Sequence, residues 1–286
     1  MKNISIIGVG LIGGSLGMAL KKKRGYRVTG VGRHPEKLRL ARRLGAVDAW
    51  TADFREGTAD ADIVVVAAPV GMIVPVIGRI LPSLSPGTVI TDAGSVKGPV
   101  TRGAEELLEG SGIIFAGSHP MAGSEKTGVR HASRDLFRGA SVVITPPGAK
   151  DRVPAALRRM WTDTGAKVLV MSPEKHDRLA AVISHLPHVL SAALVTAASA
   201  ARPREKALLK DLIAGSFRDM TRVSDSDPVL WTDISVHNSS ELAKQLDAYT
   251  ALLKKVRGML GKSGASGRKL YRFYGKARNE HKKLIR

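Results

Sequence analysis

A glycine-rich, polar segment from Gly117 to Gly128 carries the residues of this chain that are best suited to chemistry. It contains an imidazole at His119, a carboxylate at Glu125, hydroxyl groups and an amine. The apolar runs 112–116 and 140–145 on either side are typical of buried strands, so we expect a loop at the end of a sheet strand. A neutral imidazole accepts a proton near pH 7, and His119 is therefore our leading candidate for a catalytic base.

A pair of histidines in the C-terminal half raises the question of a metal site. His185 and His188 are three residues apart and can share one face of a helix, as metal ligands often do. The chain has no cysteine, and the sequence offers no obvious third ligand. We therefore predict no metal site in this cluster, which begins with His176 and Asp177.

Two arginines further along the chain are suited to binding an anion. Arg218 and Arg222 are four residues apart, so on a helix both would project from one side, where an anion between them makes their repulsion tolerable. Either arginine could instead pair with a nearby carboxylate, and the sequence leaves this open for Arg218. The neighbouring acids are Asp219, Asp225 and Asp227.

The elements that must position these groups begin with a glycine motif at the N-terminus. The apolar run 4–9 predicts a strand and the periodic segment 14–22 a helix. Between them, Gly8 permits a tight turn, Gly10 lets a pyrophosphate approach the backbone, and Gly13 lets helix and strand pack closely. This context favours a dinucleotide site over a glycine-rich turn without a ligand. The predicted cofactor contacts are Gly8, Gly10, Leu11, Ile12, Gly13, Arg33 and Pro69.

The end of the second predicted strand indicates which dinucleotide binds. Strand 27–31 is followed by Gly32, Arg33 and His34, where an Asp or Glu normally binds the ribose hydroxyls of NAD. Without that carboxylate nothing repels a 2′-phosphate, and a guanidinium can bind one. We predict NADP in preference to NAD. The alternative is that Arg33 only covers the adenine and that both cofactors serve.

Strands and helices alternate up to about residue 172. Further apolar strands are expected at 63–68, 88–92 and 167–171, with a helix at 153–164. The alternation predicts right-handed crossovers and a parallel sheet, that is, an α/β Rossmann-type dinucleotide-binding domain. Because loops after successive parallel strands share one edge, Ser95 should meet the His119 segment there.

The pattern becomes helical throughout after Ser172. We predict a dinucleotide-binding domain over 1–172, an all-α C-terminal domain for substrate binding and dimerisation over 173–260, and a basic tail over 261–286. In the tail, a flexible joint at 261–267 should lead into a solvated or weakly helical stretch.

The segment 179–201 contains no charged residue and is long enough to cross a bilayer. Its histidines, proline and alanines suit a helix buried on all sides within protein, so we predict no membrane partner. Such a helix needs more apolar cover than one small domain provides, which predicts a homodimer through the helical domain.

The composition bears on partners and location. A formal charge of +20 makes nucleic acid or an anionic membrane conceivable partners. Much of the excess lies in the tail, where aromatic side chains are few, so nucleic acid is not the predicted partner. The absence of cysteine excludes disulfides and thiolate zinc sites and favours a reducing, cytoplasmic location.

Taken together, these motifs closely resemble the prephenate dehydrogenase family of tyrosine biosynthesis, which includes arogenate dehydrogenases. The resemblance covers about residues 4–257 and rests on the segments 8–15, 118–128 and 184–188 together with 215–231. It implies oxidative decarboxylation of prephenate to 4-hydroxyphenylpyruvate with reduction of NAD(P). The alternative reaction is that of arogenate, which gives tyrosine directly.

The resemblance also implies roles for individual residues. His119 matches the catalytic histidine, which bonds the substrate 4-hydroxyl, and Ser95 matches the serine that assists it. Arg222 matches the arginine that holds the ring carboxylate, whereas Arg218 stands where the family often has lysine. The predicted substrate contacts are Ser124, Glu125, His188, Arg222 and Arg218.

Two other functions are compatible with a nucleotide domain followed by helices. One is a dehydrogenase acting on a β-hydroxyacid or an imine, but such enzymes commonly use a lysine base, whereas this site centres on His119. The other is an NADP-sensing regulator that binds nucleic acid through its basic tail. It would show salt-sensitive DNA binding and no turnover.

Overall fold

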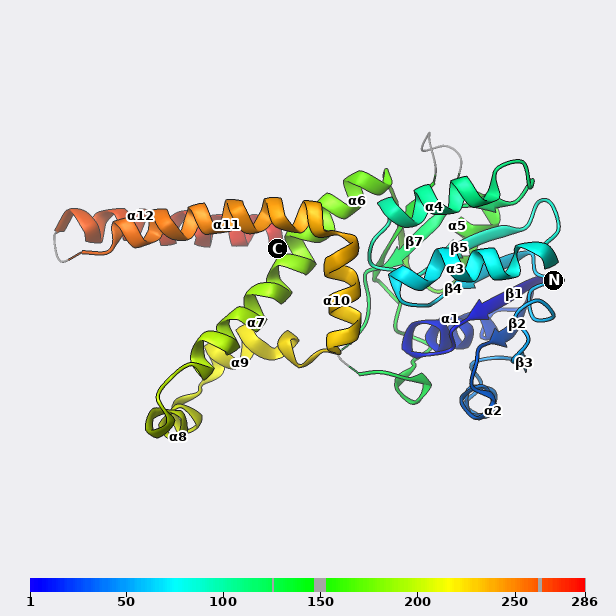
Figure 1. The fold of residues 1–286 in the computed structure, drawn as a ribbon, viewed down its shortest axis with the longest axis horizontal. Helices are drawn as coiled ribbons and strands as arrows, with labels where there is room; N and C mark the ends of the chain where they lie inside the picture. Colours follow the sequence, from blue (N-terminus) through cyan, green and yellow to red (C-terminus); the bar gives the residue numbers. More distant parts are fainter. Residues whose placement is uncertain (125, 147–152, 262–263, 286) are drawn as a thin grey trace. The chain divides into compact units, whose positions relative to one another are not determined.

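The structure is a computed structural model that describes residues 1–124, 126–146, 153–261 and 264–285 (Figure 1). The chain divides into two compact units, Met1–Ser239 and Ser240–Arg286. All residues of the candidate site lie in the first unit.

A six-stranded parallel sheet with the order β3-β2-β1-β4-β5-β6 forms the base of the first unit. Its strands are β1 (Lys2–Ile7), β2 (Tyr26–Val31), β3 (Ala49–Thr51), β4 (Ile63–Val66), β5 (Val89–Asp92) and β6 (Ile114–Phe115). The connecting helices are α1 (Leu11–Lys21), α2 (Pro35–Arg43), α3 (Val70–Ile80) with the short η1 (Leu81–Ser83), and α4 (Gly98–Leu108). The predicted Rossmann-type fold is confirmed, although the short strand β3 was not predicted.

The central strands are buried on both faces, which explains why their sequences are continuously apolar. Alternate residues enter different cores: Ile63 and Val65 pack on the side of α1, whereas Val64 and Val66 pack on the side of α3 and α4. Helices therefore cover both faces of the sheet (Figure 1), and the carboxyl ends of its strands remain available for a ligand.

A second, three-stranded sheet was not predicted. Its order is β7-β8-β9, with β7 (Gly117–Pro120) antiparallel to β8 (Ser141–Thr145) and β8 parallel to β9 (Lys167–Val170). The short η2 (Val129–His131) lies between β7 and β8, and α5 (Ala155–Asp163) lies between β8 and β9. The expectation that His119 lies in a loop was wrong, because the backbone around it pairs with β8, opposite Val143.

The rest of the first unit is helical, as predicted. It comprises α6 (Pro173–Ala180), the π-helical turn η4 (Ala181–His185), α7 (Leu186–Ser199), α8 (Pro203–Leu212), α9 (Gly215–Thr221), η5 (Arg222–Asp225) and α10 (Pro228–His237). Ser172 caps α6 by accepting from the Lys175 backbone N–H at 3.2 Å, and Pro173 occupies its first position. The Asp233 side chain of α10 accepts from Gly71 N at 3.1 Å, which fixes α10 to the start of α3.

The apolar helix in this region is not buried on all sides, contrary to expectation. The continuous helical stretch Pro173–Ser199 is long and apolar enough to cross a membrane by length and composition, and only 22% of its most apolar window is buried within the chain. Ile183 is 65% exposed. The apolar surface is available for a partner, which is consistent with the predicted dimer.

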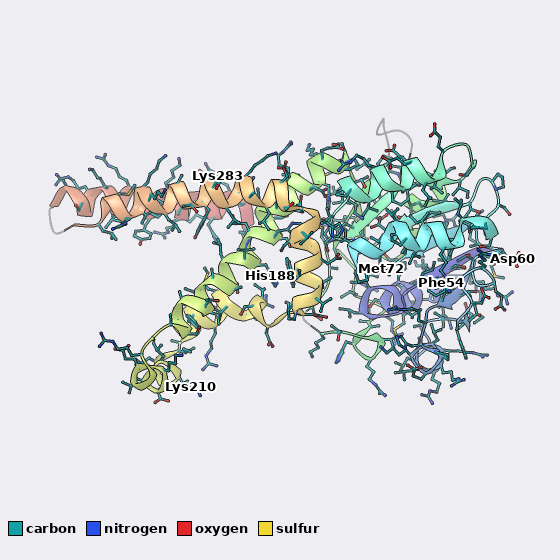
Figure 2. The ribbon with its side chains drawn as sticks, viewed as in Figure 1. Phe54, Asp60, Met72, His188, Lys210 and Lys283 are labelled. Atoms are coloured by element: carbon teal, nitrogen blue, oxygen red, sulfur yellow. The ribbon has the colours of Figure 1, made fainter. Side chains whose placement is uncertain are left out.

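The second unit contains α11 (Ser239–Met259), which begins one residue before it, and α12 (Gly264–Ile285). The predicted basic tail therefore forms a helix of 22 residues, beginning inside the segment expected to be a joint. Residues 262 and 263 of that joint lie outside the described residues. Lys283, labelled in Figure 2, is one of the many exposed basic side chains of α12.

Candidate active site

A cavity of about 840 Å³ lies at the carboxyl ends of β1, β2 and β4. It is lined by the glycine turn, by Arg33 and Pro69 after the second and fourth strands, and by Met72 of α3, which Figure 2 labels. Of the predicted cofactor residues, Leu11 and Ile12 lie in the first turn of α1. The cavity thus occupies the position at which a Rossmann-type sheet binds a dinucleotide.

The space around each glycine of the turn shows whether this cavity suits a pyrophosphate. Gly8 has a φ of +93°, and a Cβ there would lie 2.2 Å from the Ala67 carbonyl oxygen. A Cβ on Gly13 would lie 2.3 Å from Gly8 O, whereas a Cβ on Gly10 would meet nothing within 4 Å. Gly8 and Gly13 are therefore required for packing, and Gly10 leaves the backbone open to a ligand at the start of α1, so the residues fit a bound dinucleotide.

The cavity is lined by cations. Arg33 and Lys37 follow β2, Arg79 extends from α3 with its guanidinium 4.2 Å from the Phe54 ring centroid, and Arg130 comes from η2. Among the described residues that line the cavity, none is an aspartate or glutamate. Such a lining attracts a ligand with several phosphates.

The segment after β7 reaches this same cavity. Thr127, Gly128, Val129, Arg130 and His131 are part of its lining. Because β7 contains His119, one short stretch of chain carries both the imidazole and a wall of the cavity.

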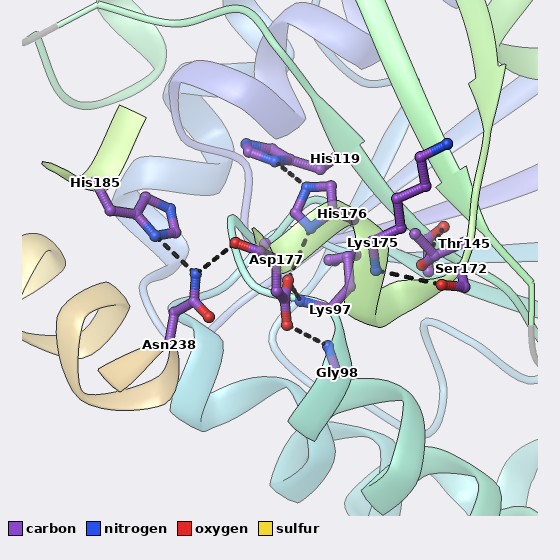
Figure 3. A network of polar contacts seen from close by, with 12 residues as sticks. Lys97, Gly98, His119, Thr145, Ser172, Lys175, His176, Asp177, His185 and Asn238 are labelled. Atoms are coloured by element: carbon purple, nitrogen blue, oxygen red, sulfur yellow. Dashed lines mark hydrogen bonds and ion pairs between the residues drawn. The ribbon is translucent and has the colours of Figure 1, made fainter. Parts of the chain in front are cut away.

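The His119 ring is buried and forms one end of a hydrogen-bonded chain (Figure 3). Its Nδ1 lies 2.8 Å from His176 Nε2, and His176 Nδ1 lies 2.8 Å from Asp177 Oδ1. Burial, together with the charges of the neighbouring His176, Lys97 and His185, lowers the pKa of His119 well below its usual value. The ring is therefore neutral near pH 7, the form that can accept a proton.

A buried ion pair between Lys97 and Asp92 holds β7 in place next to His119. Lys97, which is wholly buried, pairs through Nζ with Asp92 at the end of β5 and donates to the Ser118 carbonyl oxygen at 2.9 Å. Asp92 also accepts from the backbone N–H of Ser118 at 3.1 Å and of Gly94 at 2.8 Å. Burial lowers the pKa of Lys97, and Asp92 opposes this effect. These bonds fix the backbone next to His119 to the parallel sheet.

The histidines of η4 and α7 lie around a tryptophan. The His188 ring stacks on Trp231, with ring centroids 3.2 Å apart, and the His185 ring meets Trp231 edge to face at 6.2 Å. The Nε2 atoms of both histidines are buried without a hydrogen bond from the described residues. Burial lowers the pKa of each ring to about 4. Both rings are thus neutral, and each has a nitrogen able to bond to a ligand.

Known proteins share both parts of this arrangement. The family model described as "Prephenate dehydrogenase, nucleotide-binding domain" matches residues 16–170, and that described as "Prephenate dehydrogenase, dimerization domain" matches residues 172–272. The chain belongs to the prephenate dehydrogenase family. This family consists of NAD(P)-dependent oxidoreductases.

Individual relatives in the prephenate dehydrogenase family resemble the chain over most of its length. A prephenate dehydrogenase of Bacillus subtilis is 34% identical over 279 residues, which are 96% of this chain and 74% of that protein. The structure of Aquifex aeolicus prephenate dehydrogenase in complex with hydroxyphenyl propionate and NAD⁺ has a TM-score of 0.90 and 30% identity, covering 99% of this chain and 98% of that chain. Synechocystis arogenate dehydrogenase has a TM-score of 0.83 and 31% identity, covering 98% and 99%.

Three further predicted site residues are Ser95, Ser124 and Glu125. Ser95 is half-buried in the loop between β5 and α4 and forms no side-chain hydrogen bond within the described residues. Ser124 is exposed in the segment after β7, where its hydroxyl accepts from Lys126 N at 3.3 Å. Glu125 lies outside the described residues.

Arg218 and Arg222 do not share one α-helix. Arg218 lies in α9, which ends at Thr221, and Arg222 begins η5. Both side chains are exposed. The helix α7, which contains His188, packs against η5, which begins with Arg222.

His176 and Asp177 were seen as a cluster in the sequence but not predicted as site residues. They are buried in α6 beside β7, although 57 residues separate His176 from His119. The available signal was a His-Asp pair in the first helix after the last strand. Sequence alone does not show that this turn of α6 faces His119.

Proposed function

We propose that this chain catalyses the oxidative decarboxylation of prephenate to 4-hydroxyphenylpyruvate with NADP as oxidant. The observation that carries the proposal is the buried, neutral imidazole of His119 on a strand whose continuation lines the dinucleotide cavity. The similarity to prephenate dehydrogenases over nearly the whole chain supports the same reaction.

His119 acts as the general base. Its Nε2 takes the proton of the 4-hydroxyl while the C4–H bond breaks, and Ser95 is proposed to assist from the loop after β5. A dinucleotide held at the glycine turn of Gly8, Gly10 and Gly13 would supply the acceptor for the hydride that leaves C4. Loss of the ring carboxylate as carbon dioxide then makes the ring aromatic, and the proton on His119 returns to the phenolate oxygen. General bases of this kind contribute roughly 10²–10⁴-fold to the rate.

The helical region after Ser172 is proposed to hold the dianionic substrate. Arg222 would bind the ring carboxylate, and Arg218 and His188 would contact the rest of the molecule, together with Ser124 and Glu125. Charge-assisted bonds from a guanidinium fix both distance and orientation, which brings the reacting carbons together.

The cavity supports NADP as the preferred cofactor. Gly32 occupies the position at which an acid would bind the ribose hydroxyls, and the nearby cations Arg33 and Lys37 can pair with a 2′-phosphate. The Aquifex aeolicus relative was solved with NAD⁺. The proposed preference for NADP therefore rests on residues of this chain and not on that relative. An Arg33→Ala variant should lose about 10–100-fold in kcat/KM for NADP, as expected for one charged hydrogen bond, and little for NAD. Arg39→Ala is the matched control, because Arg39 lies over Trp50 and does not line the cavity.

Steady-state assays that cross prephenate and arogenate with NADP and NAD test the function directly. Prephenate with NADP should give the highest kcat/KM. A strong preference for NAD would refute the cofactor assignment, a preference for arogenate would change the substrate, and no turnover of either would refute the function. The predicted cytoplasmic location is tested separately, by cell fractionation.

The exposed apolar face of η4 and α7 is proposed to join two copies of the chain. The family's dimerization domain covers this region, and Val182 and Ile183 of η4 and Leu194 and Val195 of α7 are exposed. Sedimentation at micromolar concentration should give a dimer, and Ile183→Asp should shift it towards monomer. Leu44→Asp is the control, because Leu44 is exposed after α2. A wild-type monomer, or an Ile183 variant that remains dimeric, would contradict this interface.

A further inference from the structure

His176 and Asp177 continue the chain of hydrogen bonds that begins at His119 (Figure 3). His119, His176 and Asp177 are 8%, 2% and 5% exposed. We propose that His176 and Asp177 are positioning residues that hold His119 in the tautomer with a proton on Nδ1 and a free Nε2. This proposal rests on the proposed function, in which that Nε2 receives the substrate proton.

The direction of each hydrogen bond follows from the carboxylate. Asp177 can only accept, so the 2.8 Å bond to His176 Nδ1 requires a proton on that nitrogen. When the His176 ring is neutral, its Nε2 is then an acceptor. The 2.8 Å contact with His119 requires a donor on the other side, which is His119 Nδ1–H. His119 Nε2 is left with its lone pair.

Asp177 is itself held in place from two directions. Its Oδ1 and Oδ2 accept from the backbone N–H groups of Lys97 and Gly98, each at 2.7 Å, where α4 begins. Asn238 donates to the Asp177 carbonyl oxygen at 2.9 Å. Rotation of this carboxylate would leave two buried N–H groups unpaired, which is unfavourable. The orientation of His119 is therefore set at the junction of α6 and α4.

The same arrangement assists the proton transfer. When His119 gains a proton, the Nδ1–H bond to His176 strengthens, and the buried carboxylate of Asp177 lies next in line to face the new charge. The positive charges of His176, Lys97 and His185 oppose the protonation of His119. Within the chain of hydrogen bonds, the carboxylate of Asp177 is the group whose charge favours it.

Two substitutions of His176 separate positioning from packing. His176→Leu fills the space but offers His119 no acceptor, and kcat should fall about tenfold or more while KM for prephenate changes little. His176→Gln should restore most of kcat, because its amide oxygen can accept from His119 Nδ1 while its NH₂ group donates to Asp177. His281→Leu, on an exposed residue of α12, is the control.

Nitrogen NMR of the imidazole groups of the full chain at pH 8 reads the tautomer without substrate. The His119 signals, assigned with a His119→Asn variant, should show a proton on Nδ1 in the wild type and in His176→Gln, and a mixture of tautomers in His176→Leu. A wild-type His119 protonated on Nε2, or a folded Leu variant with unchanged kcat, would overturn the proposal. If His176→Leu does not fold, the wild-type spectrum decides. Because NMR needs no turnover, a failure of the proposed function would be distinguishable from a failure of this one.

Discussion

The two sides of the active site differ in how completely their polar groups are paired. On the base side, His119, Asp177 and Lys97 are buried. His119 bonds to His176 of α6, Asp177 to the backbone N–H of Lys97 at the start of α4, and Lys97 to the Ser118 carbonyl oxygen of β7. On the substrate side, the Nε2 atoms of His185 and His188 are buried without a partner among the described residues. Arg218 is exposed in the short helix α9.

The difference follows from what each side must do. A base works only if its tautomer and position are set before the substrate arrives, so fixed hydrogen bonds are favoured there. Groups that bind a ligand need atoms that are available to it, although a buried nitrogen without a partner destabilises the free protein. The base side should therefore govern kcat and the substrate side KM. Two experiments test this division, and a third tests the cost of the unpaired histidines.

The largest effect is expected from His119→Asn. Asparagine can still bond to His176 but cannot act as a base near pH 7, so kcat should fall by about 10²–10⁴-fold with little change in KM. Stopped-flow and steady-state kinetics measure both constants, with His281→Asn on α12 as control. Near-normal turnover would remove His119 from the mechanism and with it the contrast between the two sides.

A smaller effect, on a different constant, is expected from Arg222→Ala. Loss of one charged hydrogen bond to the ring carboxylate should raise KM for prephenate about 10–100-fold while kcat changes less. Lys210→Ala on α8, which Figure 2 labels, removes the same charge from an exposed residue of the helical region and controls for general attraction of the dianion. If kcat fell and KM did not, Arg222 would belong to the base side.

The smallest effect concerns stability at low pH. In the folded chain His185 and His188 each have a pKa of about 4, whereas in the unfolded chain their pKa is about 6.5. Between these values the unfolded state binds more protons, so stability is present above pH 6.5 and is lost as the pH falls towards 4. Calorimetry should show a lower Tm at pH 5 than at pH 7.5, with a smaller difference in His185→Gln. An equal difference in that variant would show that other groups dominate.

Much of this could be predicted from the sequence because the determining interactions are local. The strand, glycine turn and helix around Gly8 and Gly13 depend on neighbouring residues. That no Asp or Glu follows β2 can be read from the single position of Gly32. The same holds for the change to a helical pattern at Pro173, since periodicity and capping are properties of short segments. The resemblance in 118–128 and 215–231 pointed to the family, which the comparisons confirmed.

Only the tertiary structure decided which distant segments of the chain come into contact. His119 became part of a strand because β8, more than twenty residues later, pairs with it. Sequence gave no sign that α6 would place His176 and Asp177 against it, or that η4 and α7 would leave their apolar side exposed. Each of these outcomes depends on how whole elements pack, and the packing of an element follows from all of its neighbours together rather than from its own residues.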